Sequence, residues 1–215
     1  MTQQNFSLTH RTRPSTLEKD APLLLMLHGY GSDENDLFSF AGELPEKYFV
    51  VSARAPIPMQ PFGNAWYAIN FEADGGKFSN IEQAVESRKS VMQFIAELEK
   101  NYPVQKSGHT LFGFSQGSIL SYALSLSHPE KFKQIVAMSG YIDEKMLVEN
   151  YREQDFSHLR IFGSHGTQDQ VIPVDWARKN QPFLNDLNIE NDYSEYPVGH
   201  GISPAGFQKL LKWLS

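Results

Sequence analysis

Cysteine is absent from the 215 residues of this sequence. The absence excludes disulfides, a thiol nucleophile and thiolate-bound metal, and it fits a cytoplasmic location. Long apolar runs are missing too, since the longest one, residues 21–27, is far too short to cross a bilayer. The N-terminus lacks the positive and apolar parts of a signal peptide. We therefore expect no stable membrane insertion.

An excess of positive charge is also missing. The 19 lysines and arginines are outnumbered by 25 aspartates and glutamates, which gives a formal charge of −6. Nucleic-acid-binding proteins usually carry a cluster of lysine and arginine residues. Because no such cluster stands out here, we do not expect this protein to bind nucleic acid. Its oligomeric state, a homodimer included, stays open at this stage.

Apolar stretches typical of strands alternate with stretches of helical periodicity, which predicts an α/β fold with a mostly parallel sheet and helices on both faces. We expect one domain over residues 1–215, without a large cap domain. The predicted strands are 6–11 at an edge, 23–27, 48–53, 109–114, 134–138, 159–163 and 191–196; the predicted helices are 33–42, 80–100, 116–127, 143–150, 174–187 and 203–214. Ser79 and Glu82 resemble a capping box, and Ser203 followed by Pro204 predicts a helix start.

Residues 56–78 interrupt this alternation with clustered prolines and glycines. A long irregular segment inside a compact domain is usually functional, and loop aromatics often line apolar pockets. We therefore predict that Phe62, Trp66 and Tyr67 form a substrate pocket, with the segment as its wall or lid. The alternative is that Trp66 and Tyr67 only fill the core.

The most informative motif is Gly113-Phe-Ser-Gln-Gly117, which matches the Gly-x-Ser-x-Gly nucleophile elbow. In an elbow, a tight strand-to-helix turn presents the serine hydroxyl, and side chains two residues away on either side would collide. The apolar residues 109–114 predict a buried strand before the motif, and residues 116–127 predict a buried helix after it. This context makes Ser115 the candidate nucleophile.

A nucleophilic serine needs a base, and the base needs a carboxylate that orients it. In this topology the chain order is serine, acid, histidine, each after a strand. Asp169 follows a predicted strand in a turn-rich loop, and His200 lies between glycines before the last helix. We therefore assign Asp169 as the acid and His200 as the base, and expect His165 only to shape the acid loop.

The oxyanion of an acyl-transfer reaction needs two backbone N–H donors. One belongs to the residue after the nucleophile, Gln116, and the other to a loop after an early central strand. The segment Leu27-His-Gly-Tyr-Gly31 is such a loop. His28 precedes the serine in the chain, so we expect it to hold this loop rather than to act as the base.

Together these motifs resemble the phospholipase/carboxylesterase family of α/β-hydrolases, which includes the acyl-protein thioesterases. The resemblance covers most of the chain and rests on the two glycine motifs above, Gly166-Thr-Gln-Asp169, Val171-Ile-Pro173 and Gly199-His-Gly201. It implies a Ser115, Asp169, His200 triad, with the Tyr30 and Gln116 amides as oxyanion donors. It also implies hydrolysis of small acyl esters or thioesters without metal or cofactor.

The sequence therefore predicts a serine esterase that forms an acyl-serine intermediate. Acyl-protein thioesterase or lysophospholipase activity is the alternative within the family. At three positions the chain departs from common family patterns, with Ser118 after the motif, Ser32 in the oxyanion loop and Tyr67 after the tryptophan. A non-catalytic binding protein of the same fold is less compatible with a complete triad.

Overall fold

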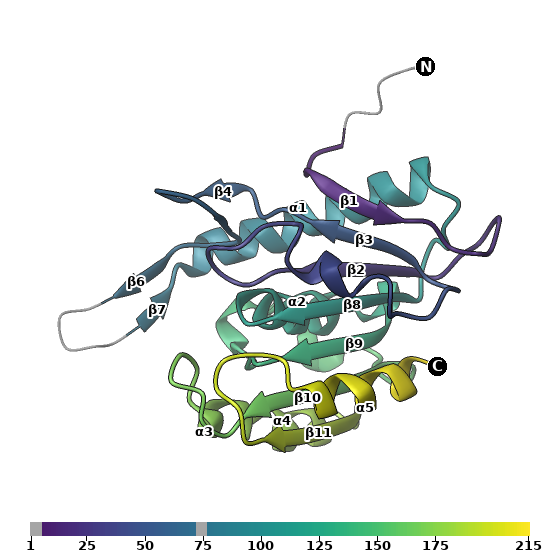
Figure 1. Cartoon of the computed structure of the whole chain (residues 1–215). Coiled ribbons are helices and arrows are strands. Elements are labelled where there is room, and N and C mark those ends of the chain that lie inside the picture. Colours follow the sequence, from purple (N-terminus) through teal and green to yellow (C-terminus); the bar gives the residue numbers. More distant parts are fainter. Residues whose placement is uncertain (1–5, 72–76) are drawn as a thin grey trace.

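A seven-stranded sheet forms the centre of the computed structural model, which describes residues 6–71 and 77–215 (Figure 1). All neighbouring strands are parallel except the edge pair β1 and β3, so the predicted mostly parallel sheet is confirmed. In spatial order the strands are β1 (His10–Arg13), β3 (Phe49–Ala53), β2 (Leu23–Leu27), β8 (His109–Phe114), β9 (Phe132–Met138), β10 (Arg160–Gly166) and β11 (Glu190–Tyr196).

The chain builds the sheet outward from two neighbouring central strands. After β2 it adds β3 on one side, and later it returns to add β8 on the other side. The two loops that leave the carboxyl ends of β2 and β8 therefore part in opposite directions. Such a switch point opens a crevice where α/β proteins bind ligands.

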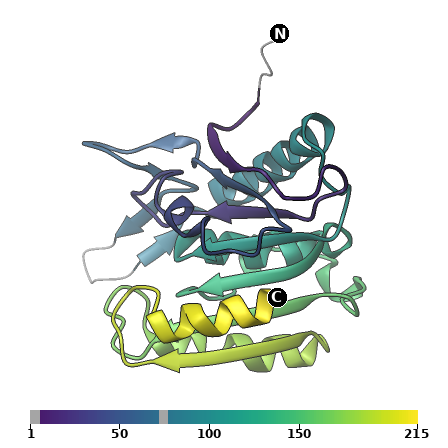
Figure 2. The same cartoon turned by 45° about the vertical axis from the view of Figure 1, so that its right-hand side comes forward.

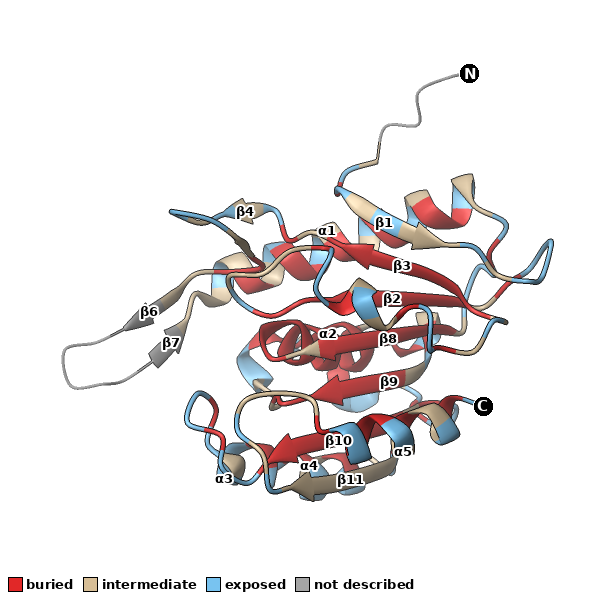
Figure 3. Cartoon of the chain, in the orientation of Figure 1, coloured by how far each residue is buried: buried red, intermediate tan, exposed pale blue. Residues whose placement is uncertain are grey.

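Helices cover both faces of the sheet, as predicted. Along β2, Leu23, Leu25 and Leu27 join one buried cluster while Leu24 and Met26 join the other. The first cluster includes residues of α1 (Ile81–Asn101), α2 (Gln116–Ser127) and α4 (Asn180–Asp186); the second includes α5 (Pro204–Leu214) and the 3-10 helix η1 (Leu37–Phe40). The rotated view shows α5 in front of the sheet (Figure 2), and the central strands and α2 are buried along their length (Figure 3).

The helix starts follow the local capping chemistry. Ser203 caps α5, with Pro204 at its first position, as predicted. The capping box predicted at Ser79 is displaced by one residue, because the Asn80 side chain accepts the backbone N–H of Gln83 instead. In the described ranges no helix is both long and apolar enough to cross a membrane.

The helix predicted over 174–187 is broken into α3 (Val174–Ala177) and α4. Pro182 explains the break. Proline has no backbone N–H, and its ring would clash with the carbonyl of Arg178, four residues earlier. It is tolerated near the start of a new helix, and α4 begins two residues before it.

Two other predicted helices were also wrong in their extent. Residues 33–42 contain only η1, because side chains such as Asp33 satisfy nearby backbone amides and compete with an α-helix. Residues 143–150 hold the short 3-10 turn η3 (Glu144–Met146), which η4 (Tyr151–Glu153) follows; a further 3-10 turn, η2 (Pro129–Lys131), joins α2 to β9.

The segment predicted to be irregular contains two small hairpins. In the first, β4 (Ile57–Pro58) pairs with β5 (Asn64–Ala65), and in the second, β6 (Ile69–Phe71) pairs with β7 (Lys77–Ser79). Both extend beyond the main sheet (Figure 1). Residues 72–76, with the paired glycines of the predicted lid, lie outside the described residues.

A buried acid–base pair lies where α1 meets the start of β8. His109 Nε2 donates to Glu99 Oε1 at 2.7 Å, and Lys131 Nζ donates to the same oxygen at 2.9 Å. Burial would raise the pKa of Glu99, but the hydrogen bonds from His109 and Lys131 outweigh it and the pKa lies below its ordinary value. For His109 burial dominates and lowers the pKa, so the folded state favours the neutral imidazole.

This pair predicts a loss of stability in weak acid. Below a pH of about 6.5, the pKa of an unfolded-state histidine, the unfolded chain takes up a proton that the folded state resists. The free energy of unfolding therefore decreases as the pH is lowered. We expect urea unfolding at pH 7, 6 and 5 to show this fall, with a smaller one for His109→Gln, which keeps an N–H donor for Glu99. One histidine contributes at most about 1.4 kcal/mol per pH unit. Equal slopes for both proteins would contradict the assignment.

Candidate active site

Ser115 occupies a strained turn between β8 and α2. Its φ is +53° and its ψ is −117°, outside the regions that L-residues usually adopt. A Cβ on Gly117 would lie 1.9 Å from the Leu27 carbonyl oxygen, and one on Gly113 would lie 2.4 Å from the Gly117 oxygen. Both glycines are therefore sterically required, which is the condition that the elbow motif imposes.

The structure brings the three residues of the predicted triad into one hydrogen-bonded chain. His200 Nε2 lies 2.9 Å from Ser115 Oγ, and His200 Nδ1 lies 2.7 Å from Asp169 Oδ2. They come from the loops after β8, β10 and β11, all at the carboxyl edge of the sheet. The Phe114 ring packs against the imidazole, with 5.1 Å between ring centroids. The arrangement links a nucleophile to a base and the base to an orienting carboxylate through two hydrogen bonds.

The Asp169 carboxylate is held from several sides. Its Oδ1 accepts the backbone N–H groups of Val171 and Ile172, at 2.8 and 2.9 Å. Burial would raise the pKa of Asp169, but the hydrogen bonds from His200, Ile172 and Val171 outweigh it and the pKa is lowered. The acid is therefore charged at neutral pH and fixes the ring nitrogen that faces it as a donor.

His165 lies beside this carboxylate without joining the triad. Its Nε2 donates to the Ile172 carbonyl at 2.9 Å and lies 3.2 Å from Asp169 Oδ2. These contacts tie the two ends of the acid loop together. They agree with the loop-shaping role expected from the sequence.

The two predicted oxyanion donors flank Ser115. Gln116 begins α2, and Tyr30 follows β2 in the loop that faces the elbow. Within the described part of the chain, neither backbone N–H donates a hydrogen bond to another protein group. Both amides thus retain their donor capacity, which an oxyanion site requires.

The loop that carries Tyr30 is fastened by His28. The His28 imidazole donates from Nδ1 to the Gly29 carbonyl at 2.7 Å and accepts the Ala55 N–H at Nε2, at 3.0 Å. Burial lowers the pKa of His28, in keeping with a neutral ring that donates at one nitrogen and accepts at the other. Both nitrogens are committed, so His28 holds the loop and cannot serve as the base.

The predicted pocket residues fall in three different environments. Tyr67 lines the cavity beside Ser115. Trp66 does not: its side chain is fully buried, and its indole N–H donates to the His28 carbonyl at 3.0 Å. Phe62 is 79% exposed on the turn of the first hairpin, away from that cavity. For Trp66 the core-filling alternative describes the observed position.

The side chain of Gln116 joins the elbow to residues 66–67. Its Oε1 accepts the Trp66 backbone N–H at 2.9 Å, and its Nε2 donates to the Tyr67 carbonyl at 2.7 Å. A second link joins the oxyanion loop to the first hairpin, where the Gly31 N–H donates to the Asn64 carbonyl at 2.9 Å and the Asn64 N–H donates to Ser32 at 2.8 Å.

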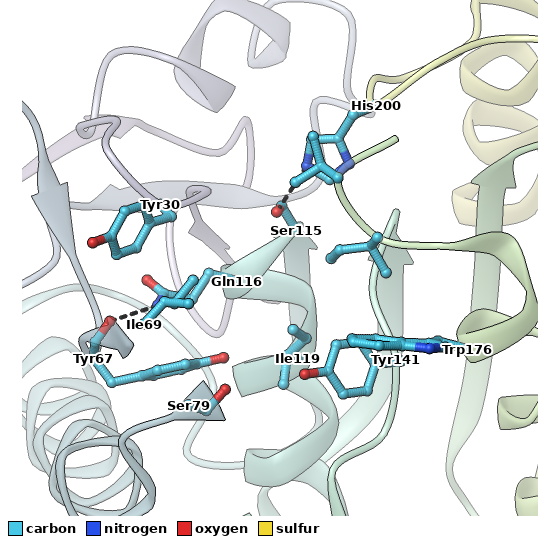
Figure 4. A pocket seen from close by; sticks show the side chains of 12 residues that line it. Tyr30, Tyr67, Ile69, Ser79, Ser115, Gln116, Ile119, Tyr141, Trp176 and His200 are labelled. Atoms are coloured by element: carbon cyan, nitrogen blue, oxygen red, sulfur yellow. Dashed lines mark hydrogen bonds between the residues drawn. The ribbon is translucent and has the colours of Figure 1, made fainter. Parts of the chain in front are cut away.

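A cavity of about 320 Å³ opens beside Ser115 (Figure 4). Its lining is mostly apolar and aromatic, as in small-molecule sites. The lining residues are Tyr30, Tyr67, Ile69, Ser79, Ser115, Gln116, Ile119, Tyr141, Val171, Ile172, Trp176 and His200.

Sequence reasoning missed several walls of this cavity. Tyr141 lies three residues after the end of β9, at the sheet edge where the site was expected, so its position was a usable signal. Trp176 lies in the short helix that follows the acid loop, and its ring meets Tyr141 edge-on at 5.1 Å. Ile119 lies one turn into the helix after Ser115.

A metal centre finds no support in the described residues. Across 6–71 and 77–215 no group of three or more histidine, aspartate or glutamate side chains is arranged to hold a metal ion.

Known proteins resemble this chain in sequence and in fold. The phospholipase/carboxylesterase family model matches residues 14–215. Acyl-protein thioesterase 1 of Yarrowia lipolytica is 27% identical over 206 residues, which cover 89% of each chain. The solved structure of esterase PE8 superposes with a TM-score of 0.81 at 26% identity, covering 96% of this chain and 97% of that one. The carboxylesterase of Mesorhizobium loti shares the fold with a TM-score of 0.82 at 20% identity, covering 99% and 96%.

Proposed function

Because this chain belongs to the phospholipase/carboxylesterase family of α/β-hydrolases, enzymes that cleave carboxylic esters, we propose that it acts through an acyl intermediate on Ser115. The observation that carries the proposal is the continuous hydrogen-bonded chain from Ser115 through His200 to Asp169. The cavity beside Ser115 supplies a mostly apolar site for the acyl group.

In the first half-reaction, His200 Nε2 takes the hydroxyl proton as Ser115 Oγ attacks the acyl carbon. The carbonyl oxygen becomes an oxyanion, which the Tyr30 and Gln116 N–H groups stabilise. When the tetrahedral intermediate collapses, the bond to the leaving group breaks and His200 returns the proton to the departing alcohol or thiol. The product of this half-reaction is an ester on Ser115.

In the second half-reaction, water replaces the leaving group. His200 takes a proton from the water as its oxygen attacks the acyl-serine, and Ser115 recovers that proton when the carboxylic acid leaves. Asp169 stays ionised throughout and keeps His200 in the tautomer that accepts at Nε2. The cycle consumes one water and regenerates the enzyme.

Thioesters are the second candidate substrates. The same steps release a thiol in place of an alcohol, and the relative from Yarrowia lipolytica is named as an acyl-protein thioesterase. An ester and a thioester of the same acyl group share the acyl intermediate on Ser115, so equal deacylation rates with unequal acylation rates would identify the preferred leaving group.

The proposal is tested by finding the acyl-enzyme. We expect a fluorophosphonate to label the protein once, and peptide mass spectrometry to find the label on the peptide that contains Ser115. A panel of 4-nitrophenyl esters and matched thioesters of increasing acyl length then gives kcat/KM for each. Label on another residue, with ester hydrolysis intact, would refute the assignment of Ser115.

A further inference from the structure

Three hydroxyl groups converge at the end of the cavity away from the triad. They belong to Tyr67, Ser79 and Tyr141, which lie below Ser115 in the view of Figure 4, Tyr67 and Ser79 to the left of Ile119 and Tyr141 to its right. The remaining walls at this end are the aromatic ring of Trp176 and the aliphatic side chains of Ile69 and Ile119. A polar group of this kind in a mostly apolar cavity usually fixes the orientation of a ligand.

The Tyr67 hydroxyl makes no hydrogen bond of ordinary geometry among the described residues, although Tyr67 is fully buried and the Ser79 hydroxyl is close to it. Buried polar atoms are nearly always paired, and leaving one unpaired is costly. Burial, assisted by Tyr141, raises the pKa of Tyr67 well above its ordinary value, and the neighbouring Ser79 hydroxyl only partly opposes this rise. The phenol is therefore protonated, and its O–H is an unused donor at the wall of the cavity.

The position of the hydroxyls relative to His200 indicates which half of an ester they meet. The leaving oxygen must lie beside His200 Nε2, which protonates it. In Figure 4, His200 and the pair Tyr67 and Ser79 lie on opposite sides of Ser115. The part of the substrate that extends toward the hydroxyls is then the acyl part.

The charge around the hydroxyls disfavours a negatively charged ligand group. Lysine and arginine are absent from the described lining of this cavity, and the charge of Asp143 contributes to the raised pKa values of Tyr67 and Tyr141. Ser79, Tyr141 and Trp176 also border a second cavity of about 470 Å³, whose other walls include Asp143 and Glu144 as well as Lys145 and Lys179. Ser79 and Tyr141 thus lie between the mostly apolar cavity beside Ser115 and this more polar one.

We propose that the acyl group of the natural ester is short and carries an uncharged oxygen, an ether, ketone or hydroxyl, that accepts a hydrogen bond from Tyr67. This inference rests on the proposed function and narrows it from esters in general to oxygenated acyl esters. An acyl chain of hydrocarbon alone would fill the chamber and leave the buried phenol unpaired.

The test is an oxygen scan along one acyl chain. The 4-nitrophenyl esters of hexanoate, 4-methoxybutanoate and 3-ethoxypropanoate have chains of equal length that differ in one CH₂ replaced by oxygen. We expect one of the two ether esters to exceed hexanoate in kcat/KM by about three- to tenfold, the effect of one buried neutral hydrogen bond. The half-ester of glutarate, which ends in a carboxylate, is expected to be poorer than both ethers.

The matched variants are Tyr67→Phe and Tyr102→Phe. Each removes a phenolic hydroxyl, but the Tyr102 hydroxyl bonds His10 Nε2 at 3.0 Å, between the first strand and the end of α1. We expect the ratio of ether to hydrocarbon kcat/KM to fall to one or below in Tyr67→Phe and to stay at its wild-type value in Tyr102→Phe. Because the ratio is taken within each protein, a partly unfolded preparation does not affect it. Ser79→Ala is the second variant if Tyr67→Phe fails to fold.

The outcomes separate this inference from the proposed function. If all esters are hydrolysed and neither ether exceeds hexanoate, the inference is overturned and the proposed function stands. A glutarate half-ester that exceeds both ethers also overturns it, because the ligand group would then be charged. If no ester is hydrolysed and no fluorophosphonate label forms, the proposed function fails and the inference fails with it.

Discussion

Replacing Ser115 with alanine is expected to eliminate fluorophosphonate labelling and to lower ester turnover by at least about 10⁴-fold. Loss of the serine or histidine of such a triad removes nearly all of the nucleophilic pathway, and what remains comes from the oxyanion site and binding. The fold should persist, because among residues 6–71 and 77–215 the Ser115 hydroxyl has a single hydrogen bond, the one to His200. The measurement is kcat/KM for a 4-nitrophenyl ester beside a labelling assay.

Ser121→Ala is the matched control for this experiment. Ser121 is also a buried serine of the same strand–helix unit, but its hydroxyl bonds the Gly117 carbonyl at 2.7 Å and does not meet His200. This variant should label and turn over like the wild type. Equal labelling of Ser115→Ala and the wild type would refute Ser115 as the nucleophile.

Replacing Asp169 with asparagine is expected to lower kcat by about 10⁴-fold, with a smaller change in KM. The backbone amides of Val171 and Ile172 require an acceptor at Oδ1, so the new NH₂ group has to face His200. His200 Nδ1 would then accept, and the ring proton would move to Nε2. A protonated Nε2 cannot accept the proton of Ser115, so the geometry is kept while the base is lost.

Asp155→Asn provides the comparison for Asp169→Asn. Asp155 also accepts a backbone N–H two residues on, from Ser157 at 2.9 Å, but it lies in an exposed loop outside the site. Its exchange should leave kcat unchanged. If Asp169→Asn retained full activity as well, the tautomer argument for Asp169 would be wrong.

The parts of the fold that sequence reasoning predicted best are those where local chemistry and burial agree. β2 is a continuous apolar run, and every residue of α2 is buried. Ser203 and Pro204 mark the start of α5 by their own capping chemistry. The site residues on the loops after β8, β10 and β11 were predicted from their order along the chain. That order was sufficient because the topology brings these three loops to the carboxyl edge of the sheet.

The errors have identifiable physical causes. The break before α4 could have been predicted from Pro182, which the sequence analysis did not consider. Trp66 was wrongly assigned to the pocket, because an aromatic residue on an irregular segment can either line a pocket or fill the core. The hydrogen bond from its indole N–H to the His28 carbonyl, which places it in the core, is visible only in the structure. Tyr67 and Ser79 lie at the two ends of the second hairpin, but Tyr141 comes from the loop after β9. Spacing along the chain therefore could not associate all three hydroxyls.

The bonds from Gln116 to residues 66–67, and from Gly31 to Asn64, have a consequence for the redesign of this enzyme. They join residues 64–67 to the two loops that carry the proposed oxyanion donors. A hairpin grafted from a homologue to change substrate preference would therefore also displace the Tyr30 or Gln116 amide. Substrate preference and reaction rate would then change together. Single side-chain exchanges inside the cavity leave the two backbone amides in place and can change substrate preference alone.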